Sequence, residues 1–171
     1  MSAEVEIRPE RPGDGAAIRR VHAGAFPGPG EADLVDALRA AGDLVGDLCL
    51  VAERDGEVVG HVAISRAELD SGVAVLALAP VGVLPAQQRA GIGSVLMRAV
   101  VERAAATDFP LIVLLGHADY YPRFGFEPAD PLGVHAPFDV PPENWMAYRL
   151  PAHTPRAPAT VRYADAFAAL G

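Results

Sequence analysis

Residues 78–101 read LAPVGVLPAQQRAGIGSVLMRAVV, and this stretch decides the fold of the chain. An apolar run ends at Pro85, a glycine-rich turn follows over residues 88–94, and a pattern typical of an amphipathic helix begins without a spacer. The first N–H groups of a helix have no intrahelical partner and carry partial positive charge, and glycine lets an anion approach the backbone closely. The stretch therefore predicts a binding site for a ligand that carries phosphate.

Spacing excludes two common phosphate loops. A P-loop requires a lysine after its second glycine, and this chain contains no lysine. A dinucleotide fingerprint requires a third small residue, but Leu96 occupies that position. What remains is the pattern Gln88-x-x-Gly91-x-Gly93 at the end of a strand. An isolated Gly-x-Gly would equally suit a helix start that needs tight packing, so the neighbouring segments have to decide.

Composition narrows the function classes. A chain of 171 residues with half of them apolar predicts one globular domain. The net charge of −8 without a basic run argues against nucleic acid as a partner and weakly favours cationic acceptors. The single cysteine, Cys49, lies in an apolar run and is expected to be buried rather than nucleophilic, and one cysteine permits no disulfide within the chain. No signal peptide and no apolar run of about 18 residues is visible, which predicts a cytoplasmic protein with no membrane partner.

The remaining elements follow from periodicity. Strands are predicted over residues 4–8, 48–54, 57–65, 72–84, 111–115 and 144–150, with a further edge strand starting at Phe126. Helices are predicted over residues 15–25, 31–41 and 92–105, with Asp14 and Asp119 as caps of the first helix and of a short helix before Gly125. The strand–helix–strand succession predicts a right-handed crossover between parallel neighbours. We therefore expect an α/β fold, a mixed central sheet with helices on both faces.

The loop and a second motif together resemble a known superfamily. The segment Tyr120-Tyr121-Pro122-Arg123-Phe124-Gly125-Phe126, with the strand and the Gln88-x-x-Gly91-x-Gly93 loop before it, resembles the GNAT superfamily of N-acetyltransferases and its YhbS-like group. The resemblance implies a GNAT domain over residues 1–150, leaving 151–171 as a Pro-rich tether and a packed C-terminal tail.

The same resemblance implies acetyl-CoA as co-substrate. The loop amides would hold its pyrophosphate, and the backbone of residues 78–84, near a local bulge, would pair with the pantetheine arm like an added strand. Arg89 would add charge near the phosphates, although a solvated surface arginine explains it equally well. The implied cofactor-binding residues are Val81, Gly82, Val83, Gln88, Arg89, Ala90, Gly91, Ile92, Gly93 and Ser94.

Two residues are predicted to take part in catalysis. Tyr121 matches the family tyrosine that often lies near the cofactor sulfur, and a phenol can protonate or hydrogen-bond the leaving thiolate. An alkylammonium acceptor must lose a proton before attack, and His117, just beyond a strand, is the leading candidate base. Glu31, Glu53, His61 and Asp119 are further candidates that surface or capping positions explain as well, and His22 is expected to pack on a helix face. The histidines and Cys49 show no metal-ligand spacing, so no metal is expected.

The sequence thus predicts an enzyme that moves an acetyl group from acetyl-CoA to a small amine or peptide by direct transfer in a ternary complex. The alternative is a non-catalytic acyl-CoA-binding sensor or scaffold. A homodimer stays open at this point.

Overall fold

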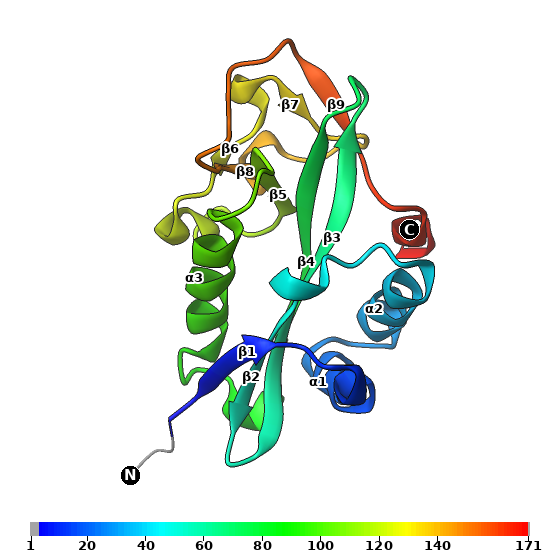
Figure 1. Cartoon of the computed structure of the whole chain (residues 1–171), viewed down its shortest axis with the longest axis vertical. Coiled ribbons are helices and arrows are strands. Elements are labelled where there is room, and N and C mark those ends of the chain that lie inside the picture. Colours follow the sequence, from blue (N-terminus) through cyan, green and yellow to red (C-terminus); the bar gives the residue numbers. More distant parts are fainter. Residues whose placement is uncertain (1–3, 171) are drawn as a thin grey trace.

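A computed structural model of the chain describes residues 4–170. The sheet runs in the order β1-β2-β3-β4-β5-β8-β6, with helix α3 on one face and helices α1 and α2 on the other (Figure 1). The helices are α1 (Gly15–Ala25), α2 (Gly30–Ala41) and α3 (Ile92–Ala104). The strands are β1 (Glu6–Pro9), β2 (Leu50–Arg54), β3 (Glu57–Leu69), β4 (Ala74–Val83), β5 (Leu111–Leu115), β6 (Glu127–Pro128), β7 (Val134–His135), β8 (Trp145–Arg149) and β9 (Ala159–Arg162). The predicted fold class is confirmed.

Strands β3 and β4 form a long antiparallel hairpin at the centre of the sheet (Figure 1). Most of their side chains are buried, as the nearly continuous apolar sequence predicts for strands covered on both faces. The register shifts where Val62 pairs with Val81 but Ile64 pairs with Leu78, so a bulge lies in β4 beside the cis peptide bond before Pro80. The expected bulge is therefore present, and β3 extends four residues beyond its predicted end at Ser65.

Strand β4 pairs with β5 over a short distance only. The parallel register joins Leu76 to Ile112 and Ala77 to Val113. Beyond these pairs, the carboxyl end of β4 has no strand neighbour on the β5 side within residues 4–170. The connection through α3 returns the chain to a parallel neighbour, as the predicted crossover requires. The two central strands therefore part at the point where the glycine-rich loop begins.

Each helix buries one apolar stripe against the sheet. Helix α3 buries Ile92, Leu96 and Met97, which explains why a bulky leucine is tolerated at position 96. Neither predicted cap forms. The Asp14 carboxylate binds the Arg8 guanidinium at 2.8 Å and the Arg11 N–H at 2.7 Å, and the helical segment before Gly125 is a 3-10 turn over Tyr121–Phe124 with no side-chain cap. Both caps were predicted from local pattern alone. Asp14 instead pairs with Arg8, and the segment after Asp119 is a 3-10 turn without a side-chain cap.

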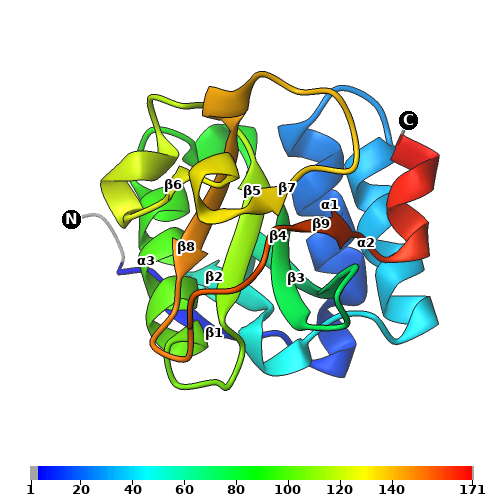
Figure 2. The ribbon, with the colours of Figure 1, turned by 90° about the horizontal axis from the view of Figure 1, so that it is seen from above.

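The C-terminal segment joins the same body. Strand β9 pairs with β3 and, in a parallel sense, with β7. The Tyr163 ring packs on Trp145 and Phe167, and the 3-10 segment Asp165–Leu170 lies beside α2 (Figure 2). The tail is therefore packed on the domain, and the domain boundary at residue 150 stays a prediction.

Candidate functional site

The glycine-rich loop ends in a left-handed turn that opens α3. Gly91 is the residue before the helix and has φ 81°, which favours glycine. Arg89 also has a positive φ of 69°, which is unusual for a residue with a side chain. The first intrahelical bond runs from the Val95 N–H to the Gly91 carbonyl. The N–H groups of the first helical turn therefore stay available, and they point out of the helix start as an anion-binding group.

A hollow lies directly over this helix start. It is lined by Val83, Gln87, Gln88, Arg89, Gly91, Ile92, Gly93, Ser94 and Tyr120. A Cβ added at Gly93 would lie 3.5 Å from the Tyr120 hydroxyl and 3.9 Å from Val83 Cγ2, so a side chain there would enter the hollow. The Tyr120 hydroxyl also lies 3.2 Å from Ser94 Oγ. The hollow therefore exists because Gly93 has no side chain, and Tyr120 closes it on one side.

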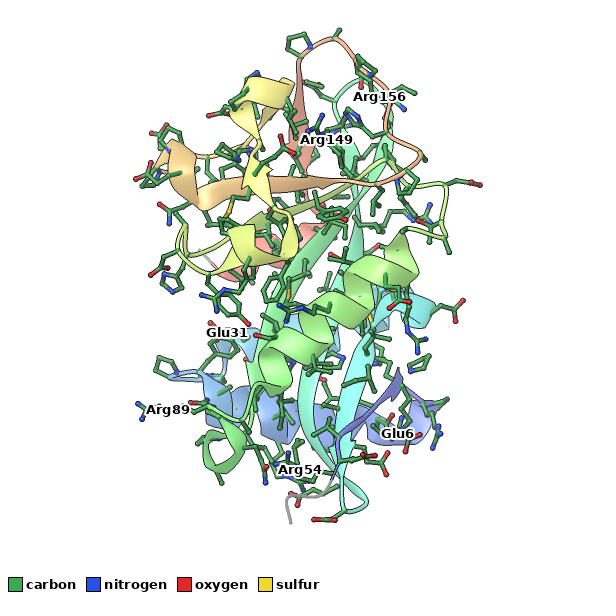
Figure 3. The ribbon with its side chains drawn as sticks, turned by 90° about the vertical axis from the view of Figure 1, so that its left-hand side faces the viewer. Glu6, Glu31, Arg54, Arg89, Arg149 and Arg156 are labelled. Atoms are coloured by element: carbon green, nitrogen blue, oxygen red, sulfur yellow. The ribbon has the colours of Figure 1, made fainter. Side chains whose placement is uncertain are left out.

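Positive charge gathers at the mouth of this hollow. The exposed Arg89 side chain extends away from the loop at the start of α3 (Figure 3). The Arg123 guanidinium stacks over the Tyr120 ring, 4.7 Å from its centroid, and donates to the Tyr120 carbonyl at 2.9 Å. Arg54 Nη1 donates to Gln87 Oε1 at 2.7 Å and so holds the loop to the end of β2. Among the described residues, neither Arg89 nor Arg123 forms a salt bridge with a carboxylate.

The free edge of β4 continues from the loop. Leu84 donates its N–H to the Val59 carbonyl at 2.8 Å. Since hydrogen-bonded and non-hydrogen-bonded pairs alternate in an antiparallel ladder, Gly82 exchanges its backbone bonds with His61. The backbone groups of Val81 and Val83 then face the β5 side, where no strand pairs with them, and the Val83 carbonyl accepts from Gln88 Nε2 at 3.0 Å. An extended ligand with amide groups fits this edge, whereas Gly82 turns its own backbone groups towards β3.

Tyr121 and Tyr120 leave the same turn in different directions. The Tyr121 ring packs against Gly116 at the end of β5, where an added Cβ would overlap the ring. Asn144 fixes Gly116 on both sides, donating from Nδ2 to its carbonyl and accepting from its N–H. Burial, followed by the neighbouring Tyr120, raises the pKa of Tyr121 to about 12, so its hydroxyl stays protonated at neutral pH. The sequence missed Tyr120 and Gln87 as lining residues, because two adjacent tyrosines do not reveal which one faces the loop.

The candidate bases are dispersed. His117 is exposed after β5, and its ring makes no hydrogen bond within residues 4–170. Glu53 pairs with Arg8 at 2.8 Å. Asp119 is exposed, and Glu31 is half-buried at the start of α2. None of these four side chains is therefore held by a contact that directs it towards the free edge of β4.

The histidines of α1 and β3 are both buried. The prediction of a surface position for His61 is wrong, because its side chain is fully buried and contacts His22 of α1 and Glu10. His22 lies on the inner face of α1, as expected, and its Nε2 is 2.8 Å from His61 Nδ1. The predicted burial of Cys49 is confirmed, and burial raises the pKa of its thiol to about 12. A thiol held neutral in this way cannot serve as a nucleophile at neutral pH.

Within residues 4–170, no group of three or more His, Cys, Asp or Glu side chains is placed to hold a metal ion. The described part of the chain also has no helix long and apolar enough to cross a membrane.

The fold and the site together define an α/β domain in which the free edge of a central strand leads into the N-terminus of a helix. A family profile described as Acetyltransferase (GNAT) domain matches residues 46–128. The uncharacterized N-acetyltransferase YjhQ of Escherichia coli (strain K12) is 38% identical over 160 residues, which cover 89% of this chain and 88% of YjhQ. The chain belongs to the GNAT acetyltransferase family.

Two solved structures are similar along nearly the whole chain. The Escherichia coli GNAT family N-acetyltransferase YhbS in complex with CoA has a TM-score of 0.89 at 26% identity, covering 98% of this chain and 94% of YhbS. A GNAT family acetyltransferase from Brucella melitensis in complex with acetyl-CoA has a TM-score of 0.79 at 34% identity, covering 96% of this chain and 99% of that one. These comparisons confirm the predicted family and the acyltransferase class, and the two solved relatives are complexes with CoA and with acetyl-CoA.

Proposed function

We propose that the chain is an acetyl-CoA-dependent N-acetyltransferase that acts by direct transfer to an amine in a ternary complex. The observation that carries this proposal is the free edge of β4, which runs into the N-terminus of α3. Val81 and Val83 would bond the two amides of the pantetheine arm, and the first N–H groups of α3 would bind the pyrophosphate. The pyrophosphate loop would consist of Gln88, Arg89, Ala90, Gly91, Ile92, Gly93 and Ser94. Gly82 turns its backbone groups towards β3, so it would not bond the cofactor through them.

The reacting end of the donor would lie between the parting strands β4 and β5. A backbone N–H of the β4 edge would stabilise the oxyanion that forms when the amine adds to the thioester carbonyl. Tyr121 would donate a hydrogen bond to the leaving thiolate. Full proton transfer from a tyrosine of pKa about 12 to a thiolate whose conjugate thiol has a pKa of roughly 8.5 is unfavourable, so hydrogen bonding is the better description.

A small amine or a peptide amine is the acceptor class, and His117 stays the base that the sequence predicts. No covalent acyl-enzyme is proposed, since Cys49 is buried and neutral. The proposed location is the cytoplasm, where the donor is found and where a chain with one cysteine is suited to reducing conditions. The proposal makes no use of nucleic acid, membrane or metal, and it holds for a monomer or a homodimer.

Calorimetric titration with acetyl-CoA, followed by a thiol-release assay over a panel of amines, polyamines, amino acids and peptides, tests the function. Binding together with acceptor-dependent thiol release is expected. Binding without transfer to any acceptor would favour a sensor or scaffold instead, and an absence of binding would refute the proposal.

The two tyrosines provide a matched pair for the site. Tyr121→Phe is expected to lower kcat by roughly tenfold or more with little change in the acetyl-CoA Kd, because only the hydrogen bond to sulfur is lost. Tyr120→Phe is expected to weaken acetyl-CoA binding instead, because it removes the hydroxyl that bonds Ser94. An unchanged kcat in Tyr121→Phe would remove its catalytic role.

A further inference from the structure

Two exposed apolar side chains lie at one end of the sheet. Among the described residues, the large apolar side chains that stay exposed are Val95, Leu115 and Phe138, whose exposed fractions are 45%, 50% and 45%. Val95 belongs to α3, whereas Leu115 is the last residue of β5 and Phe138 lies between β7 and β8. A single exposed apolar side chain is common, but two that border one place indicate a contact surface.

Leu115 and Phe138 border the same buried ring, that of Trp145. Leu115 stands opposite Trp145 in the antiparallel pairing of β5 with β8, so the two side chains lie on the same face of the sheet. The Phe138 ring meets the Trp145 ring edge-on, with centroids 6.1 Å apart. Trp145 itself is fully covered, and its Nε1 donates to the Val134 carbonyl at 2.9 Å. Leu115, Trp145 and Phe138 therefore form an apolar strip with two exposed ends.

The apolar strip lies on the face of the sheet that α3 does not cover. Along β5, Leu114 packs in the cluster that contains the buried residues of α3, whereas Val113 packs in the cluster that contains Trp145. Side chains alternate between the two faces of a strand, so Leu115 points the same way as Val113. Helix α3 lies on one face and helices α1 and α2 on the other (Figure 1), so the apolar strip shares its face with α1 and α2.

Tyr121 stands on the other side of the same strand end. Gly116 follows Leu115, and the Tyr121 ring packs where a side chain of Gly116 would lie. Because successive side chains point to opposite faces, Leu115 and Tyr121 lie on opposite sides of the end of β5. Asn144 holds Gly116 through its N–H and its carbonyl, at 2.9 Å each. A ligand on the α3 side and a second ligand on the Leu115 side would therefore meet where β4 and β5 part.

Carboxylates accompany the apolar strip along its own segment. Asp139 and Glu143 are the charged residues between β7 and β8, and both are exposed. Neither forms a salt bridge among the described residues. An alkylamine is protonated at neutral pH, so these carboxylates favour its approach and disfavour a molecule that carries a carboxylate of its own.

We propose that Leu115 and Phe138 bind the apolar part of the acceptor, and that the acceptor is a small primary amine with an alkyl or aryl group and no carboxylate. This inference rests on the proposed function and names the acceptor class for it. Two exposed side chains suit one apolar group rather than several residues of a peptide. The nitrogen forms the new C–N bond and the C–S bond breaks, so an ammonium and acetyl-CoA give amide, CoA thiol and one proton.

A series of linear amines measures the apolar contact. Ethylamine, butylamine and hexylamine differ only in methylene groups. Burying one methylene contributes about 0.8 kcal/mol, so kcat/KM in the thiol-release assay should rise by up to roughly fourfold per methylene. 6-Aminohexanoate, which carries a carboxylate at the far end of a similar chain, should react more slowly than hexylamine. Equal kcat/KM across the series would overturn the proposal, as would faster reaction with peptides than with hexylamine.

Leu115→Ser is the decisive variant, because it removes the apolar contact at a half-exposed position outside the core. The rise in kcat/KM should shrink to less than about twofold per methylene, while the acetyl-CoA Kd stays within about twofold of wild type. Leu115→Met should restore the rise. Val95→Ser is the matched control, since it removes a similarly exposed apolar side chain from α3. The proposal fails if Leu115→Ser keeps the wild-type dependence on chain length, or if Val95→Ser loses it equally.

Trp145 provides a readout without turnover, because it is the only tryptophan of the chain. Hexylamine added to the complex of the protein with CoA should change the tryptophan emission, and ethylamine should do so only at a much higher concentration. An emission that hexylamine leaves unchanged would contradict the proposal. Light scattering on the same samples tests another occupant: a wild-type dimer that Leu115→Ser converts to a monomer would assign the apolar strip to an interface between two copies.

Failure of the proposed function gives a different result. Wild-type protein that binds no acetyl-CoA, or that transfers to no acceptor of any class, would refute the function on which the inference rests. Wild-type protein that acetylates polyamines or peptides but not hexylamine would keep that function and overturn the acceptor class.

Discussion

Replacing Gly93 by alanine should change stability and cofactor affinity in opposite directions. Gly93 is the second residue of α3, and an added Cβ meets no atom closer than 3.5 Å. Alanine is favoured over glycine in a helix by roughly 0.5–1 kcal/mol, so the free energy of unfolding should rise. For a domain of this length, that corresponds to a Tm increase of about 1–4 °C.

The same methyl group should interfere with the donor. It would occupy space between the Tyr120 hydroxyl and Val83, where the pyrophosphate is proposed to contact the backbone. Overpacking by one methyl group costs about 1–3 kcal/mol, which corresponds to a roughly five- to 150-fold weaker acetyl-CoA Kd. We therefore expect one added methyl group at position 93 to cause a large loss of acetyl-CoA affinity.

Differential scanning fluorimetry of the ligand-free protein and calorimetric titration with acetyl-CoA measure the two effects. Gly13→Ala is the control, because nothing lies within 4 Å of its added Cβ and it is remote from the hollow. An acetyl-CoA Kd equal to that of wild type in Gly93→Ala would show that the cofactor does not approach the start of α3, and the reasoning about this site would fail.

Three further predictions concern Gly116, Arg89 and His22. Gly116→Ala should displace the Tyr121 ring, lowering Tm and kcat while the acetyl-CoA Kd is kept; kinetics and calorimetry on the same sample decide this. Arg89→Gly should raise Tm, because it relieves a positive φ, but weaken acetyl-CoA binding by at most about fivefold and reduce its dependence on salt. His22 takes up a proton near pH 6.5 when unfolded but only near pH 3 when folded, so its stabilisation is complete above pH 6.5 and is lost as pH falls towards 3. Urea unfolding between pH 6 and 4 should therefore show a slope shallower by up to about 1.4 kcal/mol per pH unit in His22→Gln, and an unchanged slope would contradict the assignment.

The glycine-rich loop and the helix start that follows it were predictable because their determinants are local. Gly91 and Gly93 lie two residues apart, and their conformation, the helix start and the preceding strand all follow from one continuous stretch. Backbone N–H groups bind the ligand in such a site, so no distant side chain has to be known. The order of strands and helices was predictable for the same reason, since periodicity is a local property.

The sequence by itself therefore determined the family and the fold class, and it placed the glycine-rich loop between a strand and the start of a helix. Only the tertiary structure decided which polar side chains meet. His22 and His61 are 39 residues apart, and His61 and Glu10 are 51 residues apart, in elements that local pattern assigns to a helix face and a surface strand. The packing of α1 and α2 on the sheet removes these groups from water, and a buried polar group must then find a partner or remain costly. That requirement acts across the fold, so it is not encoded in any single stretch of the chain.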